Sequence, residues 1–407
     1  MSAISRGGVF ASSSFRQYFA GQAFSYVGDG MRTLAVPLLV YHLTRSALST
    51  SVSFACELGP FALFGLIGGS LADRVDRRRL MIVCDLLRFS VMTAFALAFA
   101  AGRLTLPELY GGLVAISICA AFFLGGQASS IPYLVGKSRT TQAMAALMAA
   151  ENATNIVAPV AGGALFSLFG PLPALAINAS TYACSQVSLA LVPTLGPDDP
   201  HGLPNLREVA HDVALGFRFL RDDVAMRAVA VTSFWLNLFG VGAYAVLIPF
   251  LKRDFAASDR EVGIFLGIGA LGAIAGALAA GKMESRWPFG KALAAAYLVD
   301  ALFFVPIVFA QNIWLAAIIW SIGGAGAAFE ATQIIGWRLR VTPDEMIGRV
   351  TGALRLVVLC GIVPGVIAFG SVADRYGPRL AMAIAALGYL GIAASAALVP
   401  AIRNERR

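Results

Sequence analysis

The sequence predicts an all-α polytopic membrane protein with twelve transmembrane helices in two six-helix bundles. Of its 407 residues, 58% are hydrophobic and only 13% are charged, and the mean hydropathy is +0.75. Soluble domains carry roughly 25% charged residues, so this chain has too little polar surface to cover a soluble fold. Apolar runs of about 20 residues, the length that crosses a bilayer, recur along the whole chain.

Twelve segments are long and apolar enough to be spanning helices. The first six lie before a long polar stretch and the second six lie after it. This stretch contains Pro197, Pro200 and Pro204, and its residues 205–222 have some amphipathic helical character. We therefore predict an N-terminal bundle (1–195), a linker (196–227) and a C-terminal bundle (228–407). The segments are 18–41, 48–71, 80–100, 109–134, 143–167, 172–193, 228–250, 262–282, 291–310, 313–336, 350–372 and 380–401.

Basic residues set the predicted orientation. Cytoplasmic loops of membrane proteins are enriched in Lys and Arg. These residues are far more frequent in the loops that lie on the same side as the N-terminus than in the alternate loops. Both termini are therefore predicted to be cytoplasmic. The loop arginines also account for the net charge of +8, and no basic face interleaved with aromatics suggests nucleic-acid binding.

A charged motif follows the second segment, where Gly69-Ser-Leu-Ala-Asp73-Arg74 leads into Val-Asp-Arg77-Arg78-Arg79. Small residues let helix backbones approach closely. An acid before a basic cluster is typical of a cytoplasmic helix end that docks on a neighbouring helix. The alternative is a simple topology anchor.

The two halves repeat one another. Gly281 to Lys291 is a degenerate counterpart of the Gly69–Arg79 motif. Pro159-Val-Ala-Gly162-Gly163 with Gly170-Pro171 is echoed by Pro364 with Gly377-Pro378. Because the halves have the same predicted topology, the repeat is parallel, as in transporters whose two bundles rock around a central site.

The order of these motifs resembles the major facilitator superfamily over essentially the whole chain. Gly69 to Arg78 is similar to its helix 2–3 signature, and Pro159 with Gly162 and Gly163 is similar to the helix 5 signature of its exporters, with Ala158 in place of a glycine. Two further motifs resemble the branch of this superfamily that holds the enterobactin exporter and macrolide efflux proteins. They are Ser25-Tyr-Val-Gly28-Asp29-Gly30 and Val341-Thr-Pro-Asp344-Glu-x-x-Gly348-Arg349-Val350.

This resemblance implies a secondary transporter in a bacterial-type inner membrane that exports an amphipathic organic molecule, such as a siderophore or drug, in exchange for protons. It also implies that Asp73 docks at the start of the 350–372 segment, so the conformational gate would comprise Gly69, Asp73, Arg74, Arg77, Arg78, Arg349 and Arg355. The 109–134 segment departs from the pattern, because it carries Gly125-Gly126-Gln127 where a basic proton-relay motif is expected.

Ionisable residues within the spans are the candidate functional groups, since each costs about 2.5–3.5 kcal/mol at a helix centre. In the first segment Gln22, Ser25, Asp29 and Arg32 share one helical face. Asp29, near the middle of the span, either carries a proton or is held structurally. Arg32 pairs with Glu57 of the next segment, which lies at similar depth, or with Asp29, which would leave Glu57 as the freer acid; it could also attract an anionic substrate group.

Further polar residues are predicted to be either cavity lining or structural. Glu151 and Glu330 are further proton candidates, and the alternative for Glu330 is a pair with Arg355. Asp300, near the middle of the 291–310 segment, has no evident role in the sequence, whereas Asp85 and Arg88 suggest a structural pair. The remaining substrate-cavity candidates are Gln127, Asn152, Asn155, Asn237, Tyr244, Gln333 and Trp337.

Other chemistries have little support in the sequence. The three histidines show no metal-ligand spacing, the five cysteines form no CxxC, and no Walker loop or nucleophile elbow is present. We therefore predict no metal, no cofactor besides the proton gradient, no enzymatic activity and a functional monomer. The alternatives are an uncoupled or lipid-like substrate transporter and, more distantly, an intramembrane enzyme or a receptor.

Overall fold

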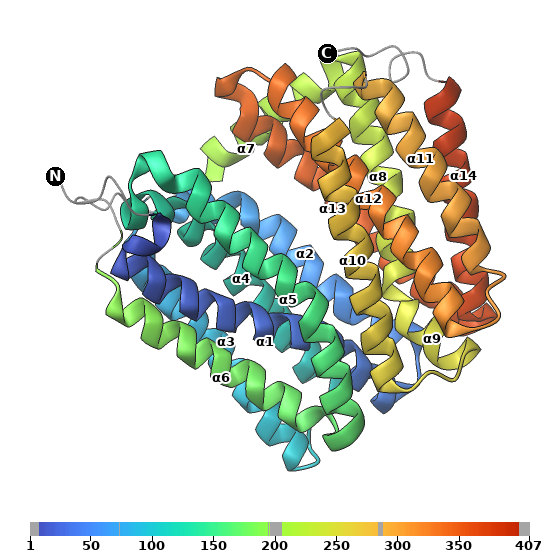
Figure 1. Cartoon of the computed structure of the whole chain (residues 1–407), viewed down its shortest axis with the longest axis horizontal. Helices are drawn as coiled ribbons and strands as arrows, with labels where there is room; N and C mark the ends of the chain where they lie inside the picture. The colour runs from blue at the N-terminus through green and yellow to red at the C-terminus, as the bar shows by residue number, and fades with distance from the viewer. Residues whose placement is uncertain (1–7, 73, 194, 196–205, 284–287, 399–407) are drawn as a thin grey trace. The chain divides into compact units, whose positions relative to one another are not determined.

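The computed structural model describes residues 8–72, 74–193, 195, 206–283 and 288–398, and every regular element in them is helical (Figure 1). Three are short 3-10 turns. The first six α-helices correspond to the first six predicted spans. They are α1 (Ser13–Thr44), α2 (Ala47–Ala72), α3 (Arg77–Ala100), α4 (Leu106–Val135), α5 (Thr140–Phe169) and α6 (Pro171–Leu191).

The later helices match the other predicted spans, with one break. The predicted 228–250 span is divided at Val246 into two helices, α8 and α9. The remaining elements are α7 (Leu206–Asp222), α8 (Val224–Ala245), α9 (Leu247–Asp254), α10 (Asp259–Met283), α11 (Phe289–Ile307), α12 (Ile313–Val341), α13 (Ile347–Tyr376) and α14 (Pro378–Leu398).

Length and hydropathy support the membrane assignment. Among the described residues, ten helices are long and apolar enough to cross a bilayer by this measure. The others that match predicted spans, α1 and α6, carry several polar residues, and those of α1 include the Gln22–Arg32 face. The all-α twelve-helix fold is confirmed.

Local sequence explains where helices begin and end. The Asp76 side chain accepts hydrogen bonds from the backbone N–H groups of Arg78 and Arg79, which starts α3. Asn312 does the same for Leu315 at the start of α12. Side chains of this kind satisfy the free N–H groups of a first turn. Gly136, at φ 80°, ends α4 in a backbone conformation that few other residues adopt.

The contacts divide the chain into two compact units. Unit 1 comprises residues 1–36 and 56–206, and unit 2 comprises residues 37–55 and 207–407. The end of α1 and the start of α2 therefore pack with unit 2. The predicted boundaries near residues 195 and 228 are drawn by position along the sequence, not by contacts, and they remain a prediction.

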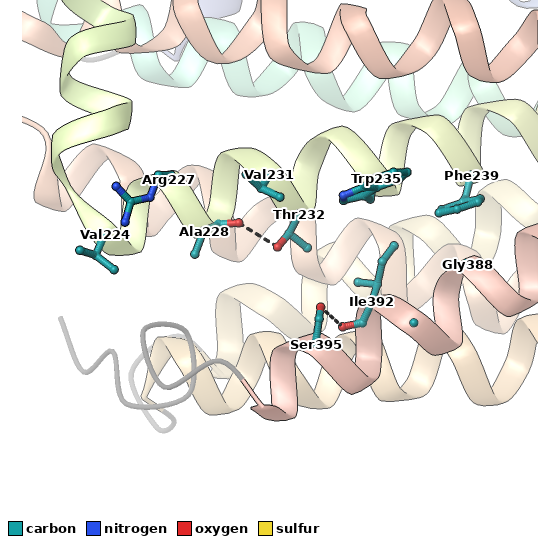
Figure 2. Close-up of a pocket in the computed structure, with 11 residues that line it drawn as sticks. Val224, Arg227, Ala228, Val231, Thr232, Trp235, Phe239, Gly388, Ile392 and Ser395 are labelled. Atoms are coloured by element: carbon teal, nitrogen blue, oxygen red, sulfur yellow. Dashed lines mark hydrogen bonds between the residues drawn. The ribbon is translucent and has the colours of Figure 1, made fainter.

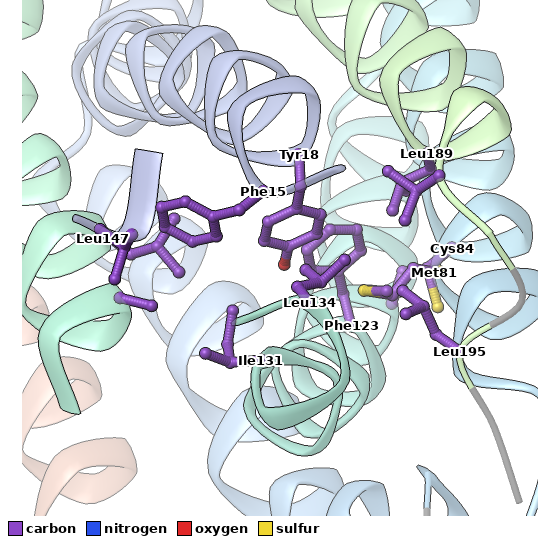
Figure 3. Close-up of a cluster of buried hydrophobic side chains, with 14 residues drawn as sticks. Phe15, Tyr18, Met81, Cys84, Phe123, Ile131, Leu134, Leu147, Leu189 and Leu195 are labelled. Carbon is purple, nitrogen blue, oxygen red and sulfur yellow. The ribbon is translucent and has the colours of Figure 1, made fainter. Parts of the chain in front are cut away.

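Unit 1 has an apolar core at one end of its helices (Figure 3). Tyr18 of α1 is fully buried there and lies beside Phe123 of α4, with Met81 of α3 and Leu189 of α6 packed around them. Residues far apart in the sequence are thereby fixed against one another. This core holds α1, α3, α4 and α6 in register beside the polar residues described below.

In unit 2, helices α10 and α12 cross closely because the contact is made by small residues. A side chain at Gly272 would collide with the Ser321 backbone, and one at Gly276 would collide with the Ala325 backbone. Close backbone approach of this kind stabilises helix pairs inside a bilayer, where the hydrophobic effect cannot. The crossing fixes α12, which carries Glu330.

Candidate functional site

The centre of the site in unit 1 is the carboxylate of Asp29 on α1. The hydroxyl of Tyr182, on α6, donates a hydrogen bond to Asp29 Oδ1 at 2.5 Å. The Asp29 side chain is 33% exposed, whereas Tyr182 is fully buried. The Asp29 carboxylate is therefore held by one buried donor and is reachable from outside the unit.

Arg32 contacts both acids that the sequence offered as partners. Its Nη2 lies 2.8 Å from Glu57 Oε1, and its Nε lies 3.6 Å from Asp29 Oδ1. The closer, hydrogen-bonded ion pair is therefore with Glu57, and Asp29 is the secondary contact. The Glu57 backbone carbonyl also accepts the hydroxyl of Ser117 on α4, which fixes this turn of α2.

A buried cation packs beside the Asp29 site. The Arg88 guanidinium on α3 lies 5.5 Å from the ring centre of Tyr182 and 4.8 Å from that of Phe123. Arg88 also pairs with Asp85 at 3.5 Å, as the sequence suggested. Cations over aromatic faces are attracted by the ring quadrupole. This packing holds the Tyr182 ring, and so aims its hydroxyl at Asp29.

Other predicted cavity residues of α1 and α4 lie in helix contacts. Gln22 is buried and its side-chain amide donates to Ser185 of α6 at 3.1 Å. Ser25 is also buried. The amide of Gln127 on α4 donates to the hydroxyl of Tyr26 at 2.9 Å. In this structure, Gln22 and Gln127 therefore join neighbouring helices, and Ser25 is packed in the interior.

The polar face of α5 is open. Glu151, Asn152 and Asn155 are all exposed, and Glu151 lies within electrostatic range of Asp29. The helix 5 motif follows: Pro159, Gly162 and Gly163 are buried, and Gly162 faces the backbone of Met31 on α1. The small residues of this motif allow α5 to approach α1 closely next to the Asp29 site.

In unit 2, Glu330 of α12 faces Asp300 of α11, and both carboxylic side chains are buried. Glu330 and Asp300 are therefore acidic neighbours of one another. Gln333 is buried and donates to the Ala280 carbonyl of α10 at 3.1 Å. Trp337 is buried and stacks on Phe289 with ring centres 4.5 Å apart.

The α8 candidates differ in their exposure. The Asn237 side-chain amide donates to the Ser233 carbonyl one turn earlier, at 2.8 Å. Tyr244 is 37% exposed and packs edge-to-face on Phe54 of α2, with ring centres 5.4 Å apart. Only Tyr244 of the two has the exposure and aromatic surface to contact a bound molecule.

The predicted gate arginines bind helix ends. Arg77 Nε donates to the Ala72 carbonyl that ends α2, at 3.0 Å. Arg78 donates to the Leu189 and Ala190 carbonyls of α6, at 2.9 and 2.6 Å. Cations stabilise helix C-termini, where carbonyls lack partners. The backbone N–H of Arg74 bonds to the carbonyl of Leu71. Gly69 has open space beside it.

The other residues of the predicted gate are Asp73, which lies outside the described residues, and two arginines of α13. Arg349, on α13, pairs with Asp212 of the linker helix α7 at 2.7 Å. Arg355 is half-buried on the same helix. The residues of the predicted gate therefore belong to both units, and its docking contact stays a prediction.

The predicted site did not include Asp374. Gly370-Ser-Val-Ala-Asp374-Arg375 repeats Gly69-Ser-Leu-Ala-Asp73-Arg74 at five of six positions. It stands at the end of α13, and Asp374 accepts hydrogen bonds from Ser46, Ala47 and Leu48 at the start of α2. The repeated hexapeptide was the signal that could have revealed it.

A cavity of about 560 Å³ lies between α8 and α14 in unit 2 (Figure 2). Trp235 and Phe239 of α8 face Gly388 and Ile392 of α14 across it, and Arg227 stands at one end. None of the eleven residues that line it is acidic. This cavity therefore has no carboxylate among its lining residues, and it includes neither Asp29 and Glu57 nor Asp300 and Glu330.

Helices of spanning length with buried ionisable side chains and ion pairs on several of them define a polytopic membrane protein. Comparison with known proteins agrees. A family model described as transmembrane secretion effector matches residues 5–405. The chain belongs to this family of major facilitator transporters, and it is a transporter rather than an enzyme.

Relatives and solved structures extend the comparison. The enterobactin exporter EntS of Escherichia coli O1:K1 is 25% identical over 387 residues, which cover 93% of this chain and 89% of EntS. EntS of Shigella boydii serotype 18 gives the same figures. A bacterial homologue of the human lysosomal transporter Spinster superposes with a TM-score of 0.77 at 16% identity, covering 98% of both chains. The nucleoside transporter NupG superposes with a TM-score of 0.75 at 14% identity, covering 95% of this chain and 98% of its own. These structural likenesses show the fold.

Proposed function

We propose that this protein exports an amphipathic organic molecule, such as a siderophore or a drug, across a bacterial inner membrane in exchange for protons. Its two bundles would alternately expose a central site to each face, with both termini cytoplasmic. It would work as a monomer and need no cofactor besides the proton gradient. Kinship with the enterobactin exporters supports the direction of transport and the class of substrate.

The proton step is supported by the difference between the two contacts of Arg32 with its neighbouring acids. Glu57 takes the close contact at 2.8 Å, and Asp29 stays at 3.6 Å with a third of its side chain exposed. A close cation stabilises the ionised form of an acid, so an acid in a short ion pair stays charged. An acid that is reachable and more distant from the cation can bind and release a proton. Asp29 is therefore our candidate for the proton carrier.

Export needs competition between cargo and proton at one place. A protonated Asp29 is neutral, so it no longer attracts Arg32 or a positively charged or hydrogen-bond-donating group of the cargo. An ionised Asp29 attracts both again. If the two ligands favour different states of the transporter, the gradient of one drives movement of the other.

The test is transport in proteoliposomes made with the purified protein and a pH-sensitive dye inside. Enterobactin serves as the probe, with a macrolide in parallel. We expect the wild-type protein to move protons when either probe is added to the proteoliposomes. In Asp29→Asn the rate of this proton movement should be at least tenfold lower. Asp222→Asn, which removes an exposed carboxylate of α7, is the matched control and should behave as wild type.

Two results would refute the proposal. One is full proton-coupled transport by Asp29→Asn at wild-type levels of inserted protein. The other is transport of a probe by the wild-type protein with no accompanying proton movement, which would favour an uncoupled transporter.

A further inference from the structure

We propose that Asp300 and Glu330 form a second protonation site, in unit 2, that binds and releases one proton during transport. The place of this proton in a transport cycle rests on the proposed function. The binding of the proton does not, because it follows from the contact between the two side chains and from their surroundings.

The two carboxylic acids are neighbours across the α11–α12 interface, and Asp300 Oδ1 lies against Gly326, one turn before Glu330. Asp300 is 2% exposed and Glu330 is 8% exposed. Both therefore stand apart from solvent, on helices that cross the bilayer. Two carboxylates in contact at a site of low dielectric cannot both be ionised.

Three of the four carboxylic oxygens have no hydrogen-bond donor among the described residues. Among the residues that the structure describes, no donor reaches either oxygen of Asp300 or Oε2 of Glu330. A carboxylate can only accept, so two ionised groups would leave these oxygens unsatisfied. One proton held between them supplies the missing donor and halves the charge. The geometry is that of an acid–carboxylate pair.

The surroundings contain no compensating cation in the described chain. The titratable groups near enough to respond to the charge of the pair are the phenols of Tyr297, one turn away on α11, and Tyr389 of α14. The Tyr297 hydroxyl is fully buried and has no hydrogen-bond partner among the described residues. It is thus an unused donor beside the two acids, available when the pair gives up its proton.

Helix α12 is shaped to admit the Asp300 carboxylate. Gly326 lies one turn before Glu330, and a side chain there would collide with Asp300 Oδ1. The missing side chain at Gly326 lets Asp300 approach the α12 backbone and reach Glu330. The pair is thus built into the helix contact, and any shift of α12 along α11 changes the distance between the two acids.

This site differs from the Asp29 site in kind. Asp29 has a tyrosine donor and a nearby arginine, whereas the Asp300–Glu330 pair has only a second acid. The first site contains a fixed cation, Arg32, shared between Asp29 and Glu57, whereas the second contains two acids that a proton can neutralise. Each unit would then carry one titrating site.

The first experiment measures proton binding without transport. Full-length protein in detergent is stepped from acidic to alkaline pH in the presence of a pH indicator dye. We expect the wild type to release one more proton per molecule than the double variant Asp300→Asn with Glu330→Gln. Infrared difference spectra should show the C=O band of a protonated carboxyl group in the wild type and its loss in the double variant. Asp222→Asn should match the wild type over the neutral range.

The second experiment places the proton in the cycle. In the proteoliposome assay with enterobactin, Glu330→Gln should lower the number of protons moved per molecule of probe while probe movement persists. If the double variant does not insert, Glu330→Gln alone decides the matter, because Gln can donate to Asp300 as a protonated Glu does.

Equal proton release by wild type and double variant would overturn the site. An unchanged proton-to-probe ratio in Glu330→Gln would overturn its role in transport. Failure of the wild type to move protons with any probe would refute the proposed function, and the detergent measurement would still decide whether the pair binds a proton.

Discussion

The carboxylate of Asp374, at the end of α13, accepts a hydrogen bond from the Ser46 hydroxyl, just before α2, at 2.5 Å. It also accepts the backbone N–H groups of Ala47 at 2.6 Å and Leu48 at 3.1 Å. Arg253 of α9 contacts the same carboxylate at 3.3 Å and the Arg45 carbonyl at 2.6 Å. One acid from α13 thus caps the first turn of α2.

Asp374→Ala should lower the stability of the folded protein by about 1–2 kcal/mol, because it leaves the free N–H groups at the start of α2 without an acceptor. Asp374→Asn keeps one of the two acceptor oxygens and loses the other together with the charge, so it should cost less than Asp374→Ala, about 0.5–1 kcal/mol. Thermal unfolding in detergent measures both. Asp222→Ala is the control, and equal losses in the two Asp374 variants would argue against capping.

Glu57→Gln should abolish proton-coupled transport as fully as Asp29→Asn. Removing the Glu57 charge leaves Arg32 with Asp29, already 3.6 Å away, as its one acidic partner among the described contacts. The guanidinium would then hold Asp29 ionised and prevent its titration. The proteoliposome dye assay gives the measurement, and Glu108→Gln, an exposed capping acid of α4, is the control. Retained coupling in Glu57→Gln would show that Arg32 does not regulate Asp29.

Gly326→Ala should disturb the Asp300–Glu330 contact without changing either acid. The added methyl group meets Asp300 Oδ1, so the carboxylate must move or the helices must separate. Overpacking of this kind costs about 1–3 kcal/mol. We expect a lower unfolding temperature and an altered proton release in detergent. Gly323→Ala on the same helix has open space beside it and should leave both quantities unchanged; matching effects in the two variants would point to a general intolerance of α12.

Close packing, more than charge, should hold the linker helix α7 on α13. The Asp212–Arg349 pair is partly exposed, and such pairs contribute about 0.2–1 kcal/mol. Gly216, by contrast, lies directly against the Arg349 carbonyl. Gly216→Leu should therefore destabilise unit 2 more than Asp212→Ala does. Thermal unfolding compares them, and a larger effect of Asp212→Ala would reverse this ranking.

Much of the fold follows from local sequence. Apolar segments of spanning length, separated by short turns, define the helices, because the bilayer leaves backbone polar groups no partners outside the helix. The break at Val246 was not evident, since the apolar run continues through it into α9. Asp76 and Gly136, by contrast, mark helix ends in ways that residue type alone indicates.

Partners of the polar residues followed the sequence less closely. Arg32 with Glu57 was one of two options that depth along neighbouring helices allowed, and Asp85 with Arg88 followed from their spacing on one helix. The Tyr182 bond to Asp29 links α6 to α1 over 153 positions, and no local pattern announces it.

By itself, the sequence determined that this chain is a helical membrane protein, where its spanning segments lie, and which family motifs and which acids within the spans it carries. These properties depend on the hydrophobic length of each segment and on residue identity. Only the tertiary structure decided that Asp300 meets Glu330, that Gln22, Gln333 and Trp337 are packed between helices, and that Asp374 caps α2. Such contacts depend on how the helix faces turn toward one another, which is set by close packing between segments distant in the chain.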